Sequence, residues 1–283
     1  MSKLNDLVDV DTLFFHLSDP AWVVVDCRFD LMQPESGGQR YAEGHIPGAV
    51  YAHLDRHLSG PVGERDGRHP LPEPETLAAS LRDWGVSADT QVVAYDDAGG
   101  AFAARLWWLC RWLGHDAVAV LDGGMPAWIA AGHPPSQERP HPHPGSFRAM
   151  PRPELKVEAD ELQQALADDR LLLLDARGAE RFRGESEPID PVAGHVPGAV
   201  NRPHAANLDE QGRFRSADRL RDDYAVLLDG RSPHDAAVMC GSGVSACHNI
   251  LAMHRAGLTD VRLYPGSWSE WIRDPRRPTN PRR

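Results

Sequence analysis

The chain has 283 residues, 41% of them hydrophobic, and its 41 acidic and 30 basic side chains give a formal net charge of −11. This negative charge argues against nucleic acid or an anionic membrane as the main partner. No apolar run approaches the roughly 18 residues of a membrane span, and the N-terminus lacks the basic and apolar regions of a signal peptide. We therefore expect a cytoplasmic protein that binds neither membrane nor nucleic acid.

The cysteines and histidines limit the chemistry further. The 14 histidines show no metal-ligand spacing, so we expect no metal, and nothing else points to a cofactor. The cysteines form no C-x-x-C pair, which favours free thiols in a reducing compartment over a disulfide framework. They are Cys27, Cys110, Cys240 and Cys247.

The N-terminal half alternates apolar runs, which predict buried strands, with helical patterns and glycine-rich turns. In chain order these are a strand ending in Asp-x-Arg (21–28), a Gly-His-Ile-Pro-Gly-Ala-Val turn (44–50), a helix (75–84), a strand (91–95), a helix (101–113) and a Leu-Asp-Gly-Gly-Met-Pro-Ala-Trp motif (121–128).

The C-terminal half repeats the strand, turn and Gly/Trp motifs in the same order and again places helical patterns between them, which predicts a tandem duplication. Strands that alternate with helices favour an α/β fold, with a parallel sheet covered on both faces in each half. The repeated elements are a helix (157–167), a strand ending in Asp-x-Arg (171–177), a Gly-His-Val-Pro-Gly-Ala-Val turn (194–200), a strand (236–239), a helix (245–256) and a Tyr-Pro-Gly-Ser-Trp-Ser-Glu-Trp motif (264–271).

The join between the halves is predicted where proline is densest. We expect an N-terminal domain over 1–137, a Pro-rich linker over 138–153 and a C-terminal domain over 154–283.

Comparison of the halves separates structural from functional candidates. Residues present in both halves, such as the Asp-x-Arg pairs, are interpreted as demands of the fold. One difference stands out: Asp96 follows the strand in the first half, where Cys240 follows it in the second. A carboxylate cannot serve as a sulfur nucleophile, so the first domain is predicted to be catalytically silent at this loop. We expect it to lend residues to the site of the second domain.

The loop Cys240-Gly-Ser-Gly-Val-Ser joins a strand to a helix N-terminus. Such a loop places several backbone N–H groups and the positive end of a helix dipole around one atom, here the Cys240 sulfur. This environment stabilises a thiolate and favours a nucleophile. The structural alternative is a buried cysteine at the end of a strand.

These motifs resemble the two-domain rhodanese superfamily of sulfurtransferases along essentially the whole chain. Cys240-Gly-Ser-Gly-Val-Ser is similar to the Cys-Gly-Ser-Gly-Val-Thr loop of 3-mercaptopyruvate sulfurtransferases, whereas thiosulfate-using rhodaneses carry Cys-Arg-Lys-Gly-Val-Thr. The resemblance implies two tandem rhodanese-like domains, each a five-stranded parallel sheet with helices on both faces. It also implies that Cys240 takes a sulfane sulfur from 3-mercaptopyruvate as a persulfide and passes it to a thiol, cyanide or thioredoxin.

The resemblance also implies roles for further residues. Arg181 would hold the substrate carboxylate, and Ser242, His69 and Asp55 would form a proton relay. Backbone N–H groups from 241 to 245 would stabilise the persulfide anion. That loop comprises Gly241, Ser242, Gly243, Val244 and Ser245.

Two departures from the family pattern concern substrate preference. Ser245 stands where threonine is usual. The segment 187–191 lacks the second carboxylate-binding arginine that family members often carry there, and Arg183 is the candidate to compensate. The preferred donor therefore stays open at this point.

Three alternatives compete with this interpretation. A thiosulfate:cyanide sulfurtransferase would use the same chemistry with another donor. A non-catalytic carrier would hold a Cys240 persulfide for a dedicated acceptor protein. A cysteine-dependent phosphatase is disfavoured, because it needs Cys-x₅-Arg and the corresponding position here is Ala246. The sequence does not indicate the physiological acceptor, the oligomeric state or the pathway.

Overall fold

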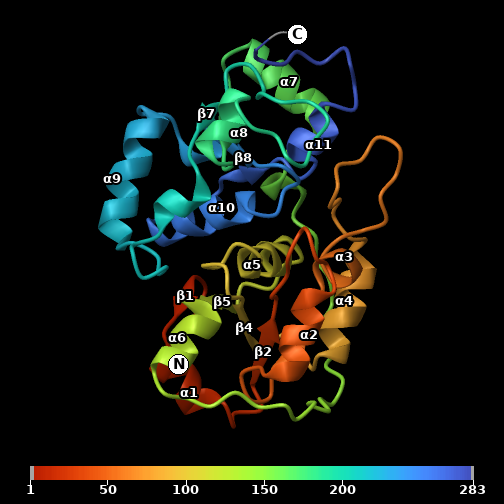
Figure 1. Ribbon diagram of the computed structural model, residues 1–283, viewed down its shortest axis with the longest axis vertical. Helices are drawn as coiled ribbons and strands as arrows, with labels where there is room; N and C mark the ends of the chain where they lie inside the picture. The colour runs from red at the N-terminus through yellow and green to blue at the C-terminus, as the bar shows by residue number, and fades with distance from the viewer. Residues whose placement is uncertain (1–2, 282–283) are drawn as a thin grey trace. The chain divides into compact units, whose positions relative to one another are not determined.

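The computed structural model describes residues 3–281, which form two compact units (Figure 1). Unit 1 combines the chain up to Gly60 with Pro72–Arg152 and Glu210–Phe214. Unit 2 combines Pro61–Leu71 with Pro153–Asp209 and the chain from Arg215 on. No helix within residues 3–281 is long and apolar enough to cross a membrane.

Unit 1 contains a five-stranded parallel sheet in the order β1-β5-β4-β2-β3. The central strand β4 is buried along its whole length, as expected for a parallel strand covered on both faces. The strands are β1 (Leu7–Val8), β2 (Trp22–Asp26), β3 (Val50–Tyr51), β4 (Gln91–Tyr95) and β5 (Val118–Leu121).

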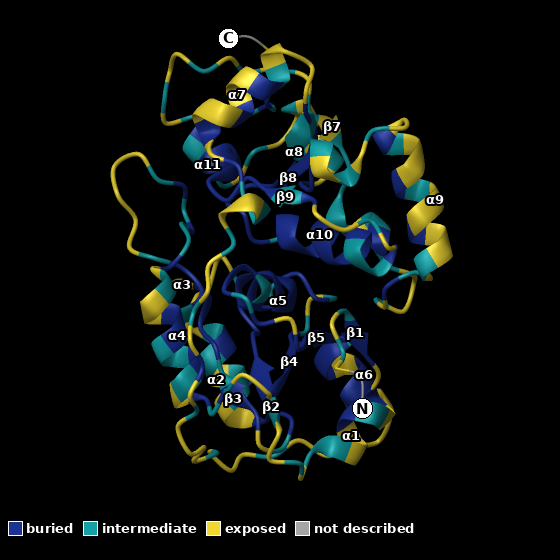
Figure 2. Ribbon diagram, turned by 180° about the vertical axis from the view of Figure 1, so that it is seen from behind, coloured by how far each residue is buried: buried dark blue, intermediate teal, exposed yellow. Residues whose placement is uncertain are grey.

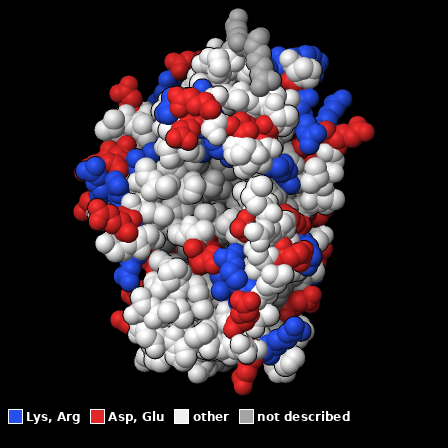
Figure 3. Space-filling model, in the orientation of Figure 1, with Lys and Arg blue, Asp and Glu red and all other residues white. Residues whose placement is uncertain are grey.

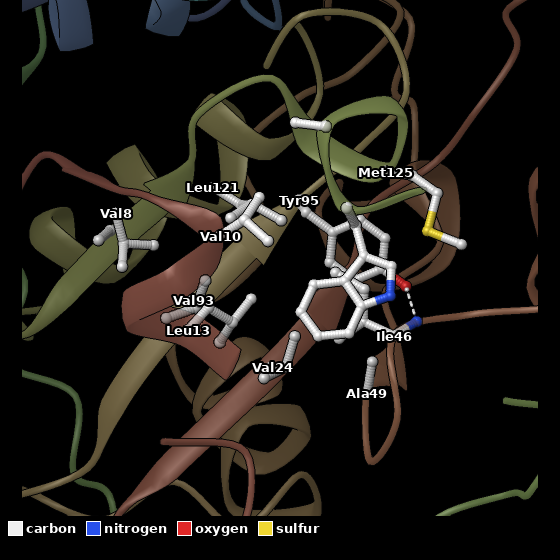
Figure 4. Packing of buried hydrophobic residues seen from close by; sticks show 13 residues of the cluster. Val8, Val10, Leu13, Val24, Ile46, Ala49, Val93, Tyr95, Leu121 and Met125 are labelled. Atoms are coloured by element: carbon white, nitrogen blue, oxygen red, sulfur yellow. Dashed lines mark hydrogen bonds between the residues drawn. The ribbon is translucent and has the colours of Figure 1, made fainter. Parts of the chain in front are cut away.

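The helices of unit 1 cover this sheet and enclose its core. Figure 4 shows Val93 and Tyr95 of β4 packed with Leu13 of the first helix, and the Tyr95 hydroxyl accepts the N–H of Ile46 at 3.1 Å. The helices are α1 (Val10–His16), α2 (Ser36–Glu43), α3 (Leu54–His57), α4 (Pro74–Asp83), α5 (Ala103–Trp112) and α6 (Gly124–Ala130).

Unit 2 repeats this architecture with a parallel sheet in the order β7-β6-β8-β9. Helix α10 (Ala246–Arg255) is buried along most of its length, whereas the neighbouring helix α9 (Ala217–Leu228) keeps an exposed side (Figure 2). The elements are β6 (Leu172–Asp175), β7 (Val200–Asn201), β8 (Ala236–Met239), β9 (Arg262–Leu263), α7 (Ala159–Ala167), α8 (Ala179–Arg183), α9 (Ala217–Leu228), α10 (Ala246–Arg255) and α11 (Ser267–Trp271), with 3₁₀ turns at Pro153–Leu155, His204–Asn207 and Pro233–Asp235.

The resemblance implied five strands in each domain, and for unit 2 this expectation is wrong. Within the described residues its sheet has four strands, and the fifth is reduced to one parallel bridge between Lys156 and Leu263. The reason is local. The 3₁₀ turn Pro153–Leu155 precedes the bridge and α7 begins at Ala159, so few residues remain to run beside β9.

The two sheets share their strand register, which supports the duplication. Asp26 of β2 lies opposite Tyr95 of β4, and Asp175 of β6 lies opposite Met239 of β8. The residues that follow Tyr95 and Met239, Asp96 and Cys240, therefore occupy equivalent positions at the carboxyl ends of their sheets.

Two segments extend the units beyond the sequence halves. Residues 61–71, drawn in orange in Figure 1, pack with unit 2, and the Arg68 backbone N–H donates to the Ser269 hydroxyl at 3.0 Å. Residues 138–152, most of the predicted linker, belong to unit 1, where the N–H of Phe147 donates to the carbonyl of Val86 at 3.0 Å. The domain limits 1–137 and 154–283 stay a prediction.

Candidate active site

Cys240 lies at the carboxyl end of β8, the strand between β6 and β9, and its side chain is buried. Its N–H donates to the Ser267 hydroxyl at 3.1 Å, and its carbonyl accepts the N–H of Trp268 at 3.1 Å. The Ser267 hydroxyl in turn donates to the carbonyl of Tyr264 at 2.9 Å. The strand end is thus tied on both backbone sides to the start of α11, which holds Cys240 in one position.

The loop after Cys240 turns sharply, and most of its backbone N–H groups are not used in hydrogen bonds within the described residues. Gly243 has φ +74°, and a Cβ added there would lie 2.3 Å from the carbonyl oxygen of Pro265, so only glycine fits. The loop leads directly into α10. Among residues 3–281 no acceptor binds the backbone N–H groups of Gly241, Ser242, Val244, Ser245 or Ala246.

The equivalent loop in unit 1 shows what such N–H groups bind. The Asp96 carboxylate accepts four backbone N–H groups, those of Ala98 and Gly100 on one oxygen at 2.8 Å and those of Phe102 and Ala103 on the other at 2.8 and 2.9 Å. The loop between β4 and α5 is therefore an anion cradle whose anion is its own side chain. In unit 2 a thiol takes the carboxylate's position.

Ser242 and His69 come together although 173 residues separate them. The Ser242 hydroxyl lies 2.7 Å from Nδ1 of His69, and both residues are buried. His69 is carried by residues 61–71, which belong to unit 2. The third predicted member of the relay, Asp55, lies on α3 in unit 1, and its part in the relay stays a prediction.

Arg181 on α8 lies beside the same loop. A Cβ added to Gly241 would lie 3.5 Å from Nη1 and 3.6 Å from Nη2 of Arg181. The guanidinium pairs with Glu187 through Nε at 3.1 Å and through Nη2 at 2.7 Å. Nη2 also lies 3.2 Å from the carboxylate of Asp190.

Arg68 is a second guanidinium that the sequence analysis missed. Its Nη2 lies 2.8 Å from the position of a Cβ on Gly241, and its Nη1 pairs with Asp190. The signal available was its position directly before the candidate His69. Arg183, the residue considered as compensation, pairs instead with Glu185 on the surface. A second arginine is thus present, but it comes from the N-terminal half and not from 187–191.

The two arginines belong to a chain of alternating charges that begins inside the fold. Arg177 joins Asp175 to Glu187, Glu187 binds Arg181, and Asp190 joins Arg181 to Arg68. Three guanidinium groups face three carboxylates, so the chain is electrically neutral when all six are charged. It is partly buried, so its interactions are screened only weakly.

The carboxylates of this chain differ in their proton affinity. Burial by itself raises the pKa of Glu187, but hydrogen bonds from Arg181 and from the N–H groups of Asp190 and Ile189 outweigh burial, so the pKa lies below its ordinary value. At Asp190 burial dominates over the attraction of Arg68 and raises the pKa. Glu187 is therefore the firmer partner of Arg181.

The other thiols are packed away from this arrangement. The Cys247 thiol is buried and donates to the carbonyl of Gly243 at 3.3 Å. Burial raises the pKa of Cys27 well above its usual range and that of Cys110 to about 12. Between residues 3 and 281 no group of three or more His, Cys, Asp and Glu side chains could hold a metal ion.

Comparisons with known proteins agree with this geometry. A rhodanese-like domain matches residues 10–131 and again 158–274. The chain is 50% identical over 274 residues to a Pseudomonas aeruginosa protein named "Probable 3-mercaptopyruvate sulfurtransferase", with 96% of each chain covered. It is 33% identical over 265 residues to the thiosulfate sulfurtransferase of Rattus norvegicus, covering 90% of this chain and 86% of that one.

A solved structure supports the same relationship. The crystal structure of SseA from Escherichia coli, described as a 3-mercaptopyruvate sulfotransferase with the rhodanese fold, superposes with a TM-score of 0.81 at 32% identity. The match covers 94% of this chain and 100% of that one.

Proposed function

The chain belongs to the rhodanese family, of which it carries two tandem domains, and we propose that it is a sulfurtransferase that moves a sulfur atom from 3-mercaptopyruvate to an acceptor through a persulfide on Cys240. The proposal also assigns Ser242 and His69, with Asp55, to proton transfer, and Arg181 to the donor carboxylate.

One observation carries the proposal most directly, the contrast between the two strand-to-helix loops. In unit 1 four N–H groups bind the Asp96 carboxylate, and in unit 2 the same position carries Cys240. There no acceptor among the described residues binds the N–H groups of Gly241, Ser242 or 244–246. A persulfide ends in an anionic sulfur near neutral pH. A cradle that binds a carboxylate in one copy suits this anion in the other.

The first step forms the persulfide. The Cys240 thiolate attacks the sulfur of 3-mercaptopyruvate, an S–S bond forms, and the C–S bond breaks with its electron pair on carbon. The resulting enolate of pyruvate takes up the proton that the donor thiol releases. The contact of 2.7 Å between Ser242 and His69 supports a hydroxyl–imidazole route for this proton.

The second step returns the enzyme to its starting state. The outer sulfur of the persulfide bonds to a nucleophile, the S–S bond breaks, and its electron pair stays on Cys240 as a thiolate. Cyanide would leave as thiocyanate, and a thiol as its own persulfide. Thioredoxin is proposed as a protein acceptor of the thiol type.

The charges around Gly241 support 3-mercaptopyruvate over thiosulfate as the donor. Arg68 and Arg181 present guanidinium nitrogens there, which suit a carboxylate. Both arginines are already partnered by buried carboxylates in a neutral chain. A donor with one negative charge disturbs this balance less than the dianion thiosulfate. Thiosulfate remains the second candidate donor, since a rat relative is named for it.

Kinetics with both donors test the proposal. We expect a higher kcat/KM for 3-mercaptopyruvate than for thiosulfate, with cyanide as the common acceptor, and the reverse order would contradict the choice of donor. Mass spectrometry after donor treatment should find the mass of one added sulfur atom in the wild type and in Cys247→Ser, but not in Cys240→Ser. An adduct that no small thiol discharges would instead indicate a carrier.

The proposed reaction favours a particular cellular compartment. All four cysteines are free and buried, and a persulfide cycle needs a reduced Cys240. A reducing compartment, and hence the cytoplasm, is therefore part of the proposal.

A further inference from the structure

Asp190 holds the two arginines beside the Cys240 loop at the same time. One of its oxygens pairs with Nη1 of Arg68 and the other lies 3.2 Å from Nη2 of Arg181. The Asp190 side chain is only 4% exposed, whereas the side chains of Arg68 and Arg181 are 26% and 21% exposed, so the carboxylate is buried while both guanidinium side chains keep access to water. Nη2 of Arg68 and Nη1 of Arg181 lie 2.8 and 3.5 Å from the position of a Cβ built on Gly241.

Glu187 and Asp190 bind different edges of the Arg181 guanidinium, and only Glu187 fixes its orientation. A guanidinium offers two edges to a carboxylate, one formed by Nε with one terminal nitrogen and one formed by both terminal nitrogens. Glu187 binds the first edge through Nε at 3.1 Å and Nη2 at 2.7 Å. Asp190 contacts only Nη2, on the second edge, so it adds little to the orientation that Glu187 already provides.

The second edge is also the one that a donor carboxylate needs. Nη1 and Nη2 of Arg181 lie 3.5 and 3.6 Å from the position of a Cβ built on Gly241, and a carboxylate bound end-on would require both nitrogens. Asp190 already uses a hydrogen of Nη2 and a nitrogen of Arg68. The donor and Asp190 therefore seek the same two guanidinium groups.

We propose that Asp190 is a specificity-determining residue that acts as an internal counter-anion, competing with the donor's carboxylate and with the pyruvate product for Arg68 and Arg181. It keeps the site neutral before the donor binds and limits how long a small carboxylate is retained. This inference rests on the proposed function, since it assumes that the anion bound at Gly241 is the donor carboxylate.

The test compares three substitutions that remove a carboxylate with little change in shape. In Asp190→Asn the KM for 3-mercaptopyruvate and the Kd of pyruvate, measured by calorimetry, should both fall about three- to tenfold, while kcat does not rise. In Glu187→Gln both constants should rise, because Arg181 loses its orientation. Glu185→Gln removes an exposed carboxylate paired with Arg183 and should change neither constant.

The opposite directions for Asp190 and Glu187 are the signature of competition. If Asp190 had only a structural role, the KM and the Kd of pyruvate would rise in Asp190→Asn as they do in Glu187→Gln. Unchanged or weaker pyruvate binding by folded Asp190→Asn overturns the inference, and Asp190→Ser provides the same readout should Asp190→Asn melt below the assay temperature. A wild type that binds pyruvate but does not turn over 3-mercaptopyruvate would contradict the proposed function, and pyruvate binding would still decide the role of Asp190.

Discussion

In each unit a single buried arginine links the end of a strand to the Gly-His turn that follows it. Arg28 pairs with Asp26 at 2.6 Å and donates to the carbonyl of Gly44 at 2.7 Å. Arg177 repeats this with Asp175 at 2.7 Å and Gly194 at 2.8 Å. One side chain thus links the two motifs that recur in each half, the strand-end Asp-x-Arg and the Gly-His turn. In unit 2 the same arginine continues to Glu187 and so supports the site.

Glu187 should make stability depend on pH at the acidic end. Its pKa is depressed in the folded state below the ordinary value of 4.5. Its contribution is therefore present above the unfolded pKa and is lost as the pH falls through the folded pKa. In urea unfolding between about pH 6 and about pH 3, Glu187→Gln should lose less free energy of unfolding than the wild type. The exposed Glu185→Gln should follow the wild type, and a steeper loss in Glu187→Gln would contradict the prediction.

We expect the Ser242–His69 contact to contribute to kcat only with a donor whose leaving group takes up a proton on carbon. We expect Ser242→Ala and His69→Asn each to lower kcat with 3-mercaptopyruvate by about 100-fold. The double variant should lose little more, because the two residues act as one unit. Thiosulfate releases sulfite without proton transfer to carbon, so its turnover is the internal control. An equal loss with both donors would show that the pair supports the loop and not the proton.

Among the elements, the same strand–loop–helix arrangement occurs as β4–α5 in unit 1 and as β8–α10 in unit 2, with a different residue at the start of the loop. In unit 1 it is closed by Asp96, and the helix α5 that follows is buried along its length. In unit 2 the same arrangement presents Cys240 before α10. The carbonyls of both residues are held alike, Asp96 by the N–H of Met125 at 2.8 Å and Cys240 by that of Trp268 at 3.1 Å.

Asp96 should therefore be a stability residue. Asp96→Asn leaves a single acceptor oxygen for four N–H groups, and we expect the free energy of unfolding to fall by about 2–4 kcal/mol. Glu75→Gln, which alters an exposed pair with Arg82, should change it by less than about 0.5 kcal/mol. Urea titration of the full chain measures both. A change in Asp96→Asn as small as in the control would show that the N–H groups find other partners.

At the scale of the whole molecule, the two units exchange segments of sequence. Residues 61–71 leave unit 1 after α3 and pack with unit 2, and residues 210–214 of the second half pack with unit 1. The first of these segments brings Arg68 and His69 to the Cys240 loop. Acidic and basic side chains are intermixed on the face shown in Figure 3, so the net charge of −11 is not gathered there in one patch.

We expect Gly67 to determine the position in which residues 61–71 pack with unit 2. A Cβ on Gly67 would lie 2.4 Å from the carbonyl oxygen of Gly266 and 2.9 Å from the Ser269 hydroxyl. We expect Gly67→Ala to shift Arg68 and His69 and to lower kcat/KM about tenfold or more. Gly63→Ala meets only the flexible end of Asp66 at 2.8 Å and should stay within about twofold of the wild type. Equal activities in the two variants would contradict this role.

The duplicated α/β architecture and the contrast between Asp96 and Cys240 were predictable from the sequence alone. Both follow from local patterns, since apolar runs, glycine turns and the residue after a strand are read within a few positions of the chain. The reduced fifth strand of unit 2 escaped this reasoning because a 3₁₀ turn, Pro153–Leu155, took the place of strand residues.

Which charged side chains meet at the site depends on how the chain folds. Arg68 and Asp190 are 122 residues apart, and His69 and Ser242 are 173 apart, so no periodicity joins them. Their contacts depend on a segment of the first half that packs with the second unit. The sequence indicated one guanidinium for the donor, and the folded chain supplies two together with the carboxylate that competes for them.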